Sequence, residues 1–355
     1  MNDQGYMHQA LLLAERGRYT VSPNPMVGCI LVKNNTIIAQ SYHQKAGLAH
    51  AEILALKEAG DQAKNATAYV TLEPCCHYGR TPPCTDALIA AGIKKIFIAS
   101  LDPNPLVAGQ GIARLQAAGI EISTGIHESE AKKLNEIFFH YIQTKRPFII
   151  AKWAMSLDGK TITHAEDSRI ISDKASQQHS HELRQQVDAI LIGSATAIKD
   201  DPLLTVRTSE VQSQPLRIIL SSQGNLPTHL KLFAPEHPGE TLIVTTEFCS
   251  KENYAKFSDK NIEVLTVSAN QFGQVDLHEL LIELGKREIT SVLVEGGRHT
   301  HESFFHENLV NKTHVYLAPT IIGKTKQKIS VAPMQFMQLK NDLHITTYCE
   351  EKKNV

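Results

Sequence analysis

"VTLEPCCHYGRTPPCTDALI" occupies residues 70–89 and decides how the first half of the chain folds. The residues before Glu73 have the apolar character of a buried strand, whereas the residues from Cys84 onward have the composition of a helix start. A strand followed by a helix predicts helices packed against a sheet. The segment between them places three cysteines and a histidine within ten positions, so we expect a functional site there rather than a simple connection.

The composition favours a two-domain protein without disulfides. A length of 355 residues suggests about two domains of roughly 150 residues each. The chain has 36 basic and 37 acidic residues with no charge run, which argues against a nucleic-acid partner. A signal segment and an apolar run of about 18 residues are both lacking, so we expect a cytoplasmic protein that does not contact a membrane. Thiols stay reduced in that compartment, which favours metal ligands, catalytic groups or core residues for the six cysteines.

Strands and helices alternate in both halves of the chain, which predicts the α/β fold class for each half. The clearest elements of the first half are a helix over 5–19, a hairpin that turns at Asn34-Asn35, a helix over 48–60 that stops at Gly60, and a closing helix over about 129–141. The polar segment QTKRP, residues 143–147, ends in proline and predicts a boundary. We therefore expect one domain at 1–146 and a second at 147–355.

Three short motifs of the first half have the ligand types of a catalytic zinc site. His50 begins a helix, Cys75 follows a strand, and Cys84 begins the next helix. One imidazole and two thiolates leave the fourth position of a tetrahedral zinc ion open for water. Glu52 follows His50 by two residues and can move the water proton, as in the H-x-E and P-C-x-x-C motifs of nucleobase deaminases. Here eight residues separate Cys75 from Cys84 instead of two, so a loop must join the ligands.

A purely structural metal site is the alternative, with Cys76 as a fourth ligand, or three unrelated thiols. Structural zinc normally has four protein ligands. Adjacent residues such as Cys75 and Cys76 are poorly placed to bind one metal ion together, and a structural site leaves Glu52 unexplained. The pattern therefore favours catalysis, with Cys76 as a packed neighbour.

The segments that carry this pattern resemble the bifunctional deaminase/reductase family of riboflavin biosynthesis. They are SPNPMVGCILV at 22–32, HAE at 50–52, the stretch at 71–122 and AMSLDGK at 154–160. The resemblance covers nearly the whole chain, and the long EPCxHxGxTPPC loop separates this family from general cytidine and RNA-adenosine deaminases. It implies a cytidine-deaminase-like three-layer α/β/α domain followed by a dihydrofolate-reductase-like α/β domain. It also implies one zinc ion, with His50, Cys75 and Cys84 as ligands and Glu52 as the proton shuttle.

The same resemblance implies a substrate pocket beside the zinc site. It assigns Asn24 to a hydrogen bond with the pyrimidine, and it assigns the ribose phosphate to His77, Arg80, Asp102 and Asn104. Guanidinium and imidazole groups suit a phosphate. The alternatives are that DPNP at 102–105 is only a turn and that Arg80 is a solvated surface charge.

The second half lacks a G-x-G-x-x-G motif, and only strand–glycine–helix segments at Gly193 and at Gly296-Gly297 suggest a dinucleotide site. The resemblance implies NADPH as the cofactor. Its contacts fall on Ala154, Ile170, Thr196, Asp200, Ser222, Gly296, Gly297, Arg298, His299, Thr300, His301, Glu302 and Ser303. The implied substrate contacts fall on Ser168, Arg184, Leu204, Arg207 and Glu295.

Reduction of the ribosyl side chain requires an opened sugar and a nearby proton donor or acceptor. The candidates are Lys152, Asp200 and Glu295, and the sequence does not order them. Ile170 stands where the family commonly has tryptophan, and His301 stands where an apolar residue is usual. We expect His301 to face solvent, with contact to the NADPH phosphates as the alternative.

The hypothesis that follows is a two-step enzyme acting on a small pyrimidine ribose phosphate, with a homo-oligomer as the expected assembly. It deaminates 2,5-diamino-6-ribosylamino-4(3H)-pyrimidinone 5′-phosphate and then reduces the product to 5-amino-6-ribitylaminouracil 5′-phosphate. One alternative is a zinc deaminase acting on RNA bases, which the neutral charge argues against. Another is a zinc-stabilised scaffold without chemistry, in which Glu52 would have no role.

Overall fold

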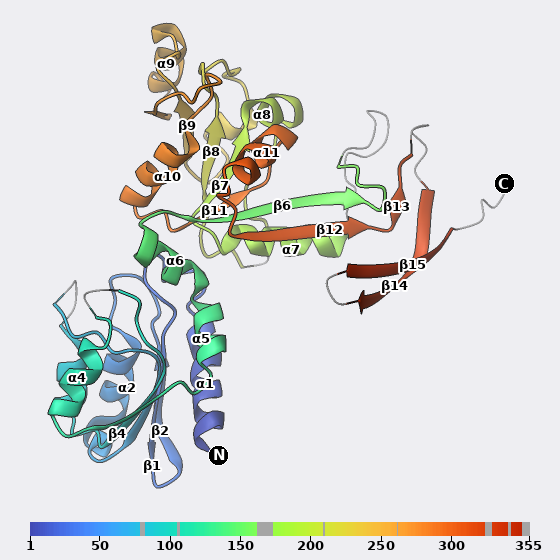
Figure 1. Ribbon diagram of the computed structural model, residues 1–355. Coiled ribbons are helices and arrows are strands. Elements are labelled where there is room, and N and C mark those ends of the chain that lie inside the picture. Colours follow the sequence, from blue (N-terminus) through green and yellow to red (C-terminus); the bar gives the residue numbers. More distant parts are fainter. Residues whose placement is uncertain are drawn as a thin grey trace. The chain divides into compact units, whose positions relative to one another are not determined.

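The computed structural model describes residues 1–78, 82–104, 107–161, 173–208, 210–260, 262–323, 329–339 and 342–349. The chain divides into two compact units, and both have α/β architecture (Figure 1). The first unit contains Met1–Phe148, Gln185–Asp188 and Val267–Val292, and the second contains Ile149–Arg184, Ala189–Thr266 and Leu293–Val355. Within the described residues, no helix has both the length and the apolar character needed to cross a membrane.

A five-stranded sheet forms the centre of the first unit, in the order β2-β1-β3-β4-β5. Its strands are β1 (Gly28–Lys33), β2 (Thr36–Tyr42), β3 (Thr67–Leu72), β4 (Lys95–Ser100) and β5 (Glu121–Thr124). β1 pairs antiparallel with β2 and with β3, whereas β3, β4 and β5 run parallel. The helices of Met1–Phe148 are α1 (Asp3–Glu15), α2 (Ala51–Ala59), the 3₁₀ turn η1 (Gly60–Ala63), α3 (Cys84–Ala90), α4 (Gln110–Ala117), α5 (Glu128–Leu134) and α6 (Glu136–Thr144).

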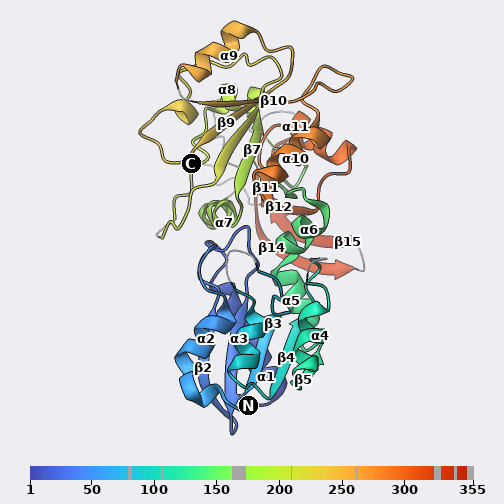
Figure 2. The same ribbon diagram turned by 90° about the vertical axis from the view of Figure 1, so that its left-hand side faces the viewer.

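Both faces of this sheet are covered by helices, which gives three layers. Ile30 and Val32 on β1 pack in one cluster with residues of α1 and α5. Cys29 and Leu31 on the same strand pack in the other cluster, with residues of α2, α3 and α4. In Figure 1, α1 and α5 lie on one side of the sheet and α2 and α4 on the other, and Figure 2 shows α2, α3 and α4 in front of it. Successive side chains of β1 point to opposite faces of the sheet, and both sets are apolar. This is the pattern expected of a strand that is covered by helices on both faces.

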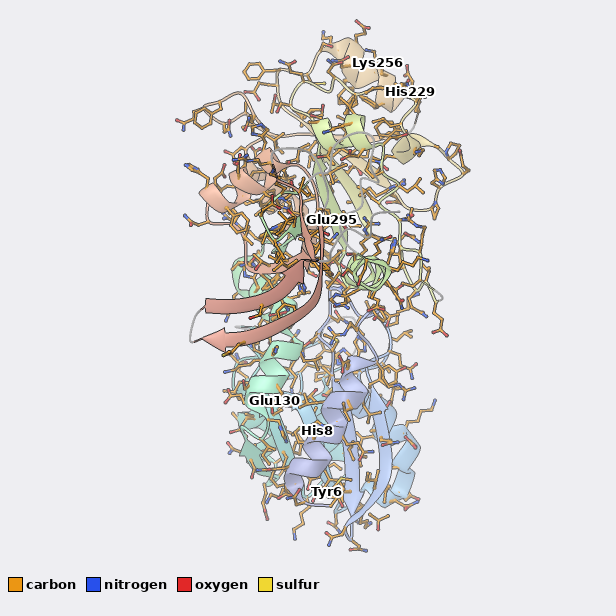
Figure 3. All side chains as sticks on the ribbon, turned by 90° about the vertical axis from the view of Figure 1, so that its right-hand side faces the viewer. Tyr6, His8, Glu130, His229, Lys256 and Glu295 are labelled. Atoms are coloured by element: carbon orange, nitrogen blue, oxygen red, sulfur yellow. The ribbon has the colours of Figure 1, made fainter. Side chains whose placement is uncertain are left out.

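Two sequence predictions in this unit are confirmed by backbone geometry. Asn34 and Asn35 both have positive φ, 52° and 60°, which is the conformation that a tight hairpin turn between β1 and β2 requires. The Tyr6 hydroxyl on α1 donates a hydrogen bond of 2.8 Å to the Asn35 carbonyl and ties this turn to the helix (Figure 3 labels Tyr6). Gly60 follows the end of α2 with a φ of 52°, as expected for a helix stop.

The prediction of one continuous helix over about 129–141 is wrong, because the segment forms α5 and α6 with a break at Asn135. The Asn135 side chain is used elsewhere. Its Oδ1 accepts a hydrogen bond from the Met26 N–H at 2.8 Å, and its Nδ2 donates to the Met26 carbonyl at 2.9 Å. Asn135 is buried, so the break in the helix satisfies two backbone groups that would otherwise lack partners.

A seven-stranded sheet, most of which belongs to the second unit, has the order β10-β9-β8-β7-β11-β6-β12. Its strands are β6 (Phe148–Ser156), β7 (Ala189–Gly193), β8 (Leu216–Leu220), β9 (Thr241–Thr245), β10 (Glu263–Thr266), β11 (Ser291–Val294) and β12 (Lys312–Ala318). The neighbouring strands β7, β8, β9 and β10 pair in parallel, and β6 pairs in parallel with β12. The strands β13 (Thr320–Ile321), β14 (Ile329–Leu339) and β15 (Asp342–Cys349) form a separate antiparallel sheet.

The remaining helices lie between these strands in the chain, as the alternation in the sequence predicts. They are α7 (Lys174–Gln185), α8 (Ser194–Asp200), the 3₁₀ turn η2 (Lys231–Phe233), α9 (Lys251–Ser258), α10 (Leu277–Lys286) and α11 (Arg298–His306). α8 begins directly after Gly193 at the end of β7, and α11 begins after Glu295, Gly296 and Gly297, which follow β11, so two helix N-termini follow these strands.

The packing of α1 on β1 generates a stability prediction at Gly28. A Cβ atom added to Gly28 would lie 2.0 Å from the Ala10 carbonyl oxygen, which is backbone and cannot move away alone. We expect Gly28→Ala to lower the free energy of unfolding by about 1–3 kcal/mol or more. In Gly5→Ala, the matched control within α1, the new atom would meet the end of the flexible Met1 side chain, so stability should hold or rise slightly. Urea denaturation followed by circular dichroism measures both, and equal midpoints would contradict the prediction.

Candidate functional site

The three predicted metal ligands come together at one edge of the first sheet. His50 is the N-cap residue of α2, Cys84 is the first residue of α3, and Cys75 lies just after β3. The Cys84 backbone N–H donates to Cys75 Sγ at 3.3 Å, and the Thr85 N–H donates to the Cys75 carbonyl at 3.2 Å. The start of α3 is therefore fixed to the strand end that carries the other thiol.

The separations between these donors fit one tetrahedral zinc ion. With Zn–S bonds of about 2.3 Å and Zn–N bonds of about 2.0 Å, tetrahedral angles place a nitrogen and a sulfur about 3.5 Å apart. His50 Nδ1 lies 3.2 Å from Cys84 Sγ and 3.6 Å from Cys75 Sγ, and all three ligand atoms lie within 4.8 Å of one another. Within the described part of the chain, this cluster includes no fourth histidine, cysteine, aspartate or glutamate, and Cys76 lies outside it. Three protein ligands and one remaining position are typical of catalytic zinc.

Hydrogen bonds among the three side chains shift their pKa values. A hydrogen bond from the Cys84 thiol lowers the pKa of Cys75, and the same bond raises the pKa of Cys84. A hydrogen bond with Cys75 raises the pKa of His50. A divalent cation at the centre of the cluster would replace the protons in these hydrogen bonds, because metal ligands must be deprotonated.

Glu52 lies next to this cluster without belonging to it. It is in the first turn of α2 and only 3% of its surface is exposed. Burial raises the pKa of Glu52, which moves the carboxyl toward the range in which it can both accept and release a proton. A buried carboxyl beside a three-ligand metal cluster is the arrangement expected for a proton shuttle.

A cavity of about 390 Å³ opens beside the cluster, within the size range of small-molecule sites. Its lining includes His50, Glu52 and Cys75, and four of the five predicted pocket residues: Asn24, His77, Asp102 and Asn104. The fifth, Arg80, lies outside the described residues. The predicted pocket residues are thus assembled around one space, although they come from three separate segments of the chain.

Two of these pocket residues have the properties expected of ligand-binding groups. His77 Nδ1 is buried and has no hydrogen-bond partner among the described residues, so it can bond to a ligand. Burial raises the pKa of Asp102 to about 6, although its Oδ1 accepts the Asn104 N–H at 2.8 Å. Asp102 therefore makes the side-chain-to-backbone hydrogen bond that is typical of turns and also lines the cavity, so both interpretations of this residue are supported.

Glu73 is a site residue that the sequence analysis did not identify. It is buried, lines the cavity, and accepts backbone hydrogen bonds from Asp102 at 3.3 Å, Gly109 at 3.0 Å and Ile112 at 3.2 Å. A Cβ on Gly111 would lie 2.3 Å from the Pro74 carbonyl oxygen, so this loop approaches Glu73 closely. The only signal in the sequence is the position of Glu73, two residues before a metal ligand. His43 was also missed, although it lines the cavity and packs its ring against His50 at a centroid distance of 5.3 Å.

A second polar group is built in the second unit around Glu295. The Arg184 guanidinium binds this carboxylate through two atoms, at 2.6 and 2.8 Å, and Lys152 Nζ lies 3.9 Å from it. Only 7% of the Glu295 side chain is exposed, and Figure 3 shows it inside the unit. Burial alone would raise the pKa of Glu295, but the charge and hydrogen bonds of Arg184 lower it. Burial lowers the pKa of Lys152.

The other predicted substrate residues are joined to this group through Thr205. Arg184 Nη1 donates to the Thr205 carbonyl at 3.1 Å, and Arg207 Nη1 donates to the Thr205 hydroxyl at 2.9 Å. Leu204 is buried and has a φ of 52°, so the chain turns sharply just before Thr205. Ser168 lies outside the described residues, as does Ile170.

Two helix N-termini with close glycine contacts form the part of this unit where a dinucleotide could bind. Gly193 precedes α8 and Gly297 precedes α11 with a φ of 74°. A Cβ on Gly193 would lie 2.6 Å from Thr300 Oγ1, and a Cβ on Gly297 would lie 2.9 Å from Thr196 Oγ1. The two helix starts therefore face each other across small residues and hydroxyls, and the backbone N–H groups at a helix start are suited to anions such as phosphates.

Several of the predicted cofactor residues are exposed or form bonds with other residues of the chain. Arg298 and Glu302 form an exposed ion pair at 2.6 Å, and the His299 side chain is 97% exposed. Asp200 is exposed at the last position of α8. Of the remaining predicted cofactor residues, Ala154 lies on β6 and Gly296 lies just after β11. The Ser222 carbonyl accepts a hydrogen bond from the Thr246 hydroxyl. The Ser303 hydroxyl donates a hydrogen bond to the His299 carbonyl.

The expectation that His301 faces solvent is wrong. The ring is half-buried, its Nε2 lies 3.1 Å from the Val294 carbonyl, and its centroid lies 5.7 Å from that of Trp153. The residue lies one turn into α11, and both His301 and Phe305 of this helix contact Trp153 on β6, so the side chain is turned toward the sheet.

Comparisons with known proteins match both halves of the chain. A family model described as the RibD C-terminal domain matches residues 147–352, and one described as the cytidine and deoxycytidylate deaminase zinc-binding region matches residues 1–100. Riboflavin biosynthesis protein RibD of Aquifex aeolicus is 44% identical over 91% of this chain and 88% of its own length. The protein of the same name from Escherichia coli is 42% identical over 94% of this chain and 92% of its own length.

Solved structures agree with the sequence matches. Acinetobacter baumannii RibD superimposes with a TM-score of 0.81 at 38% identity, covering 98% of this chain and 99% of that one. A diaminohydroxyphosphoribosylaminopyrimidine deaminase/5-amino-6-(5-phosphoribosylamino)uracil reductase from Thermotoga maritima gives 0.79 at 34% identity, covering 94% and 95%. These findings confirm the predicted fold classes of the two halves and the resemblance on which they rested. The chain belongs to the RibD family of bifunctional deaminase/reductases in riboflavin biosynthesis.

Proposed function

We propose that the site around His50 deaminates 2,5-diamino-6-ribosylamino-4(3H)-pyrimidinone 5′-phosphate and that the site around Glu295 reduces the deaminated product to 5-amino-6-ribitylaminouracil 5′-phosphate. The observation that carries the first assignment is the cluster of His50, Cys75 and Cys84 beside the buried Glu52. The name of the Thermotoga maritima relative supports the choice of substrate and the order of the two reactions. The homo-oligomeric state stays a prediction.

The first reaction exchanges an amino group for oxygen, with water as the second reactant and ammonia as the second product. Zinc held by His50, Cys75 and Cys84 would supply Lewis acidity and lower the pKa of a water molecule to about 7. Glu52 would take one proton from the attacking water and pass it to a ring nitrogen, and it would then move the remaining hydroxyl proton to the amine that departs as ammonia. Its raised pKa suits both directions of transfer. His77, Asp102 and Asn104, which line the same cavity, would hold the ribose phosphate.

For the second reaction we propose that Lys152 is the proton donor and that Glu295 orients it. NADPH would supply a hydride to C1′ of the opened sugar, so one proton must reach the nitrogen of the C=N bond. Glu295 is unsuited to give that proton, because two hydrogen bonds from Arg184 stabilise its anion. The lowered pKa of Lys152 makes its ammonium group a better acid than an ordinary lysine. Gly193, Thr196, Gly297 and Thr300 would hold the cofactor phosphates at the helix starts.

We also propose that the deaminase domain covers 1–146 and the reductase domain covers 147–355. The match of the reductase family model to residues 147–352 supports this boundary. The compact units divide the chain differently, because Gln185–Asp188 and Val267–Val292 group with the first unit.

The deaminase proposal predicts different outcomes for a shuttle variant and a ligand variant. Glu52→Gln should reduce ammonia release from the pyrimidine substrate by at least about a hundredfold while zinc content stays that of the wild type. Cys84→Ser should lower both the zinc content and ammonia release, because it replaces a thiolate ligand of the metal by a hydroxyl. Metal analysis and an ammonia assay on purified full-length protein measure these quantities. A Glu52→Gln variant with wild-type turnover would exclude the shuttle role, and an active wild type without zinc would exclude the metal.

Asp102 gives a pH-dependent stability prediction. The folded state holds its proton up to about pH 6, whereas the unfolded carboxyl has a pKa near the ordinary value of 3.8. The contribution of protonated Asp102 to the free energy of unfolding is therefore fully present below about pH 4, and it is lost as the pH rises through about 6. Asp102→Asn cannot ionise but keeps the Oδ1 acceptor for Asn104. Its stability relative to wild type should rise by up to about 3 kcal/mol between pH 4 and 7 in urea titrations. A difference that stays constant with pH would refute the prediction.

The reductase proposal predicts a large effect at Lys152. Lys152→Met should slow NADPH oxidation with the deaminated substrate by a factor of about a hundred to ten thousand, because the proton donor is lost. Ammonia release by the same preparation should not change. Lys256→Met is the matched control, since Lys256 lies on α9 at the outer end of the unit (Figure 3). Retention of rapid NADPH oxidation by Lys152→Met would show that another group supplies the proton.

A further inference from the structure

His43 lies in the wall of the deaminase cavity and has no role in the chemistry described so far. It follows β2 directly and is only 2% exposed. Its ring packs edge-on against His50, with an interplanar angle of 82°, and it is not part of the metal cluster. A buried imidazole must satisfy both of its nitrogens, so its partners indicate what it does.

The two nitrogens of His43 have partners that fix the position of its proton. Nδ1 lies 3.2 Å from the carbonyl oxygen of Ala49, the residue before the metal ligand His50. A carbonyl oxygen can only accept, so Nδ1 carries the hydrogen. A neutral imidazole has one N–H, so Nε2 is an acceptor, and the group 3.1 Å away on Asn24 must be its Nδ2 donor. Nδ1 of His43 therefore donates to the Ala49 carbonyl, and Nε2 of His43 accepts from Nδ2 of Asn24.

This order of bonds also fixes the side-chain amide of Asn24. The Asn24 backbone lies between Pro23 and Pro25, and its N–H donates to the Val21 carbonyl at 2.7 Å, which restricts the main chain. With Nδ2 held by His43, the amide cannot exchange its two ends. Among the described residues, the hydrogen bond of this side-chain amide uses Nδ2, so Oδ1 remains an acceptor on a residue that lines the cavity.

We propose that His43 is a positioning residue for deamination: it sets the amide of Asn24 so that Oδ1 accepts a hydrogen bond from an N–H group of the bound ring. This inference rests on the proposed deaminase function. The pyrimidinone substrate has a lactam N–H and exocyclic amino groups that can donate to Oδ1. A ring that presents a bare nitrogen at that point would set two lone pairs against each other, so the pocket selects for a donor.

Two substitutions separate the two hydrogen bonds of His43. The amide oxygen of Gln reaches the position of Nε2, so His43→Gln can keep the acceptor for Asn24. The shorter Asn side chain reaches only the position of Nδ1, so His43→Asn can keep the donor to Ala49 but loses the acceptor. We expect His43→Asn to lower kcat/KM for ammonia release by about tenfold or more, while His43→Gln stays within a few-fold of wild type.

The measurement uses purified full-length protein, with zinc content and NADPH oxidation recorded on the same preparations. Both should match the wild type in both variants, because neither change replaces a metal ligand or a residue of the second unit. Equal losses in the two variants, a larger loss in His43→Gln, or loss of zinc in either would overturn the proposal and leave His43 a purely structural residue. If the wild type itself releases no ammonia from the pyrimidine, the proposed deaminase function fails instead.

Discussion

The structure of the first unit depends on bringing one imidazole and two thiols within hydrogen-bonding distance of one another. β3 and β4 run parallel, so the loops that follow them leave the same edge of the sheet. Cys75 lies in the first loop and Asp102 in the second, while α2 and α3 begin at that edge with His50 and Cys84. The helix starts and strand ends of an α/β sandwich thus assemble the metal ligands and the substrate pocket without a long-range rearrangement.

Glu73 links the metal site to the substrate loop. A buried carboxylate is costly unless several donors satisfy it, and here the donors are backbone N–H groups of the segment that follows β4. Because Glu73 is two residues from Cys75, the segment that carries Asp102 and Asn104 is held at a fixed distance from the metal ligands. His43 makes a similar connection on the other wall, where it joins Asn24 to the carbonyl before His50.

The second unit uses a buried carboxylate in a different way. Glu295 is held by the charged guanidinium of Arg184 rather than by neutral amides, and Lys152 approaches the same carboxylate. Two cations around one anion leave a net positive charge at this point, which suits a phosphorylated substrate. Gly193, Thr196, Gly297 and Thr300, which we propose hold the cofactor phosphates, offer backbone N–H groups and hydroxyls instead of a charged side chain.

The sequence by itself determined the features that depend on neighbours along the chain. The hairpin turn at Asn34-Asn35 requires residues that tolerate positive φ, and Gly60 ends a helix for the same reason. Ligand types and their place at strand ends and helix starts were enough to predict His50, Cys75 and Cys84 as one site. Alternating apolar residues predicted the sheets and the fold class of both halves.

Only the tertiary structure decided which polar groups meet across segments. At the break between α5 and α6, the Asn135 side chain bonds to Met26, which lies more than a hundred residues earlier in the chain. The burial of His301 against Trp153, the backbone contacts of Glu73 and the bond between His43 and Asn24 likewise join residues from different elements. A local pattern cannot show these partners, because a polar side chain has the same sequence signature whether it faces water or a buried N–H group that requires an acceptor.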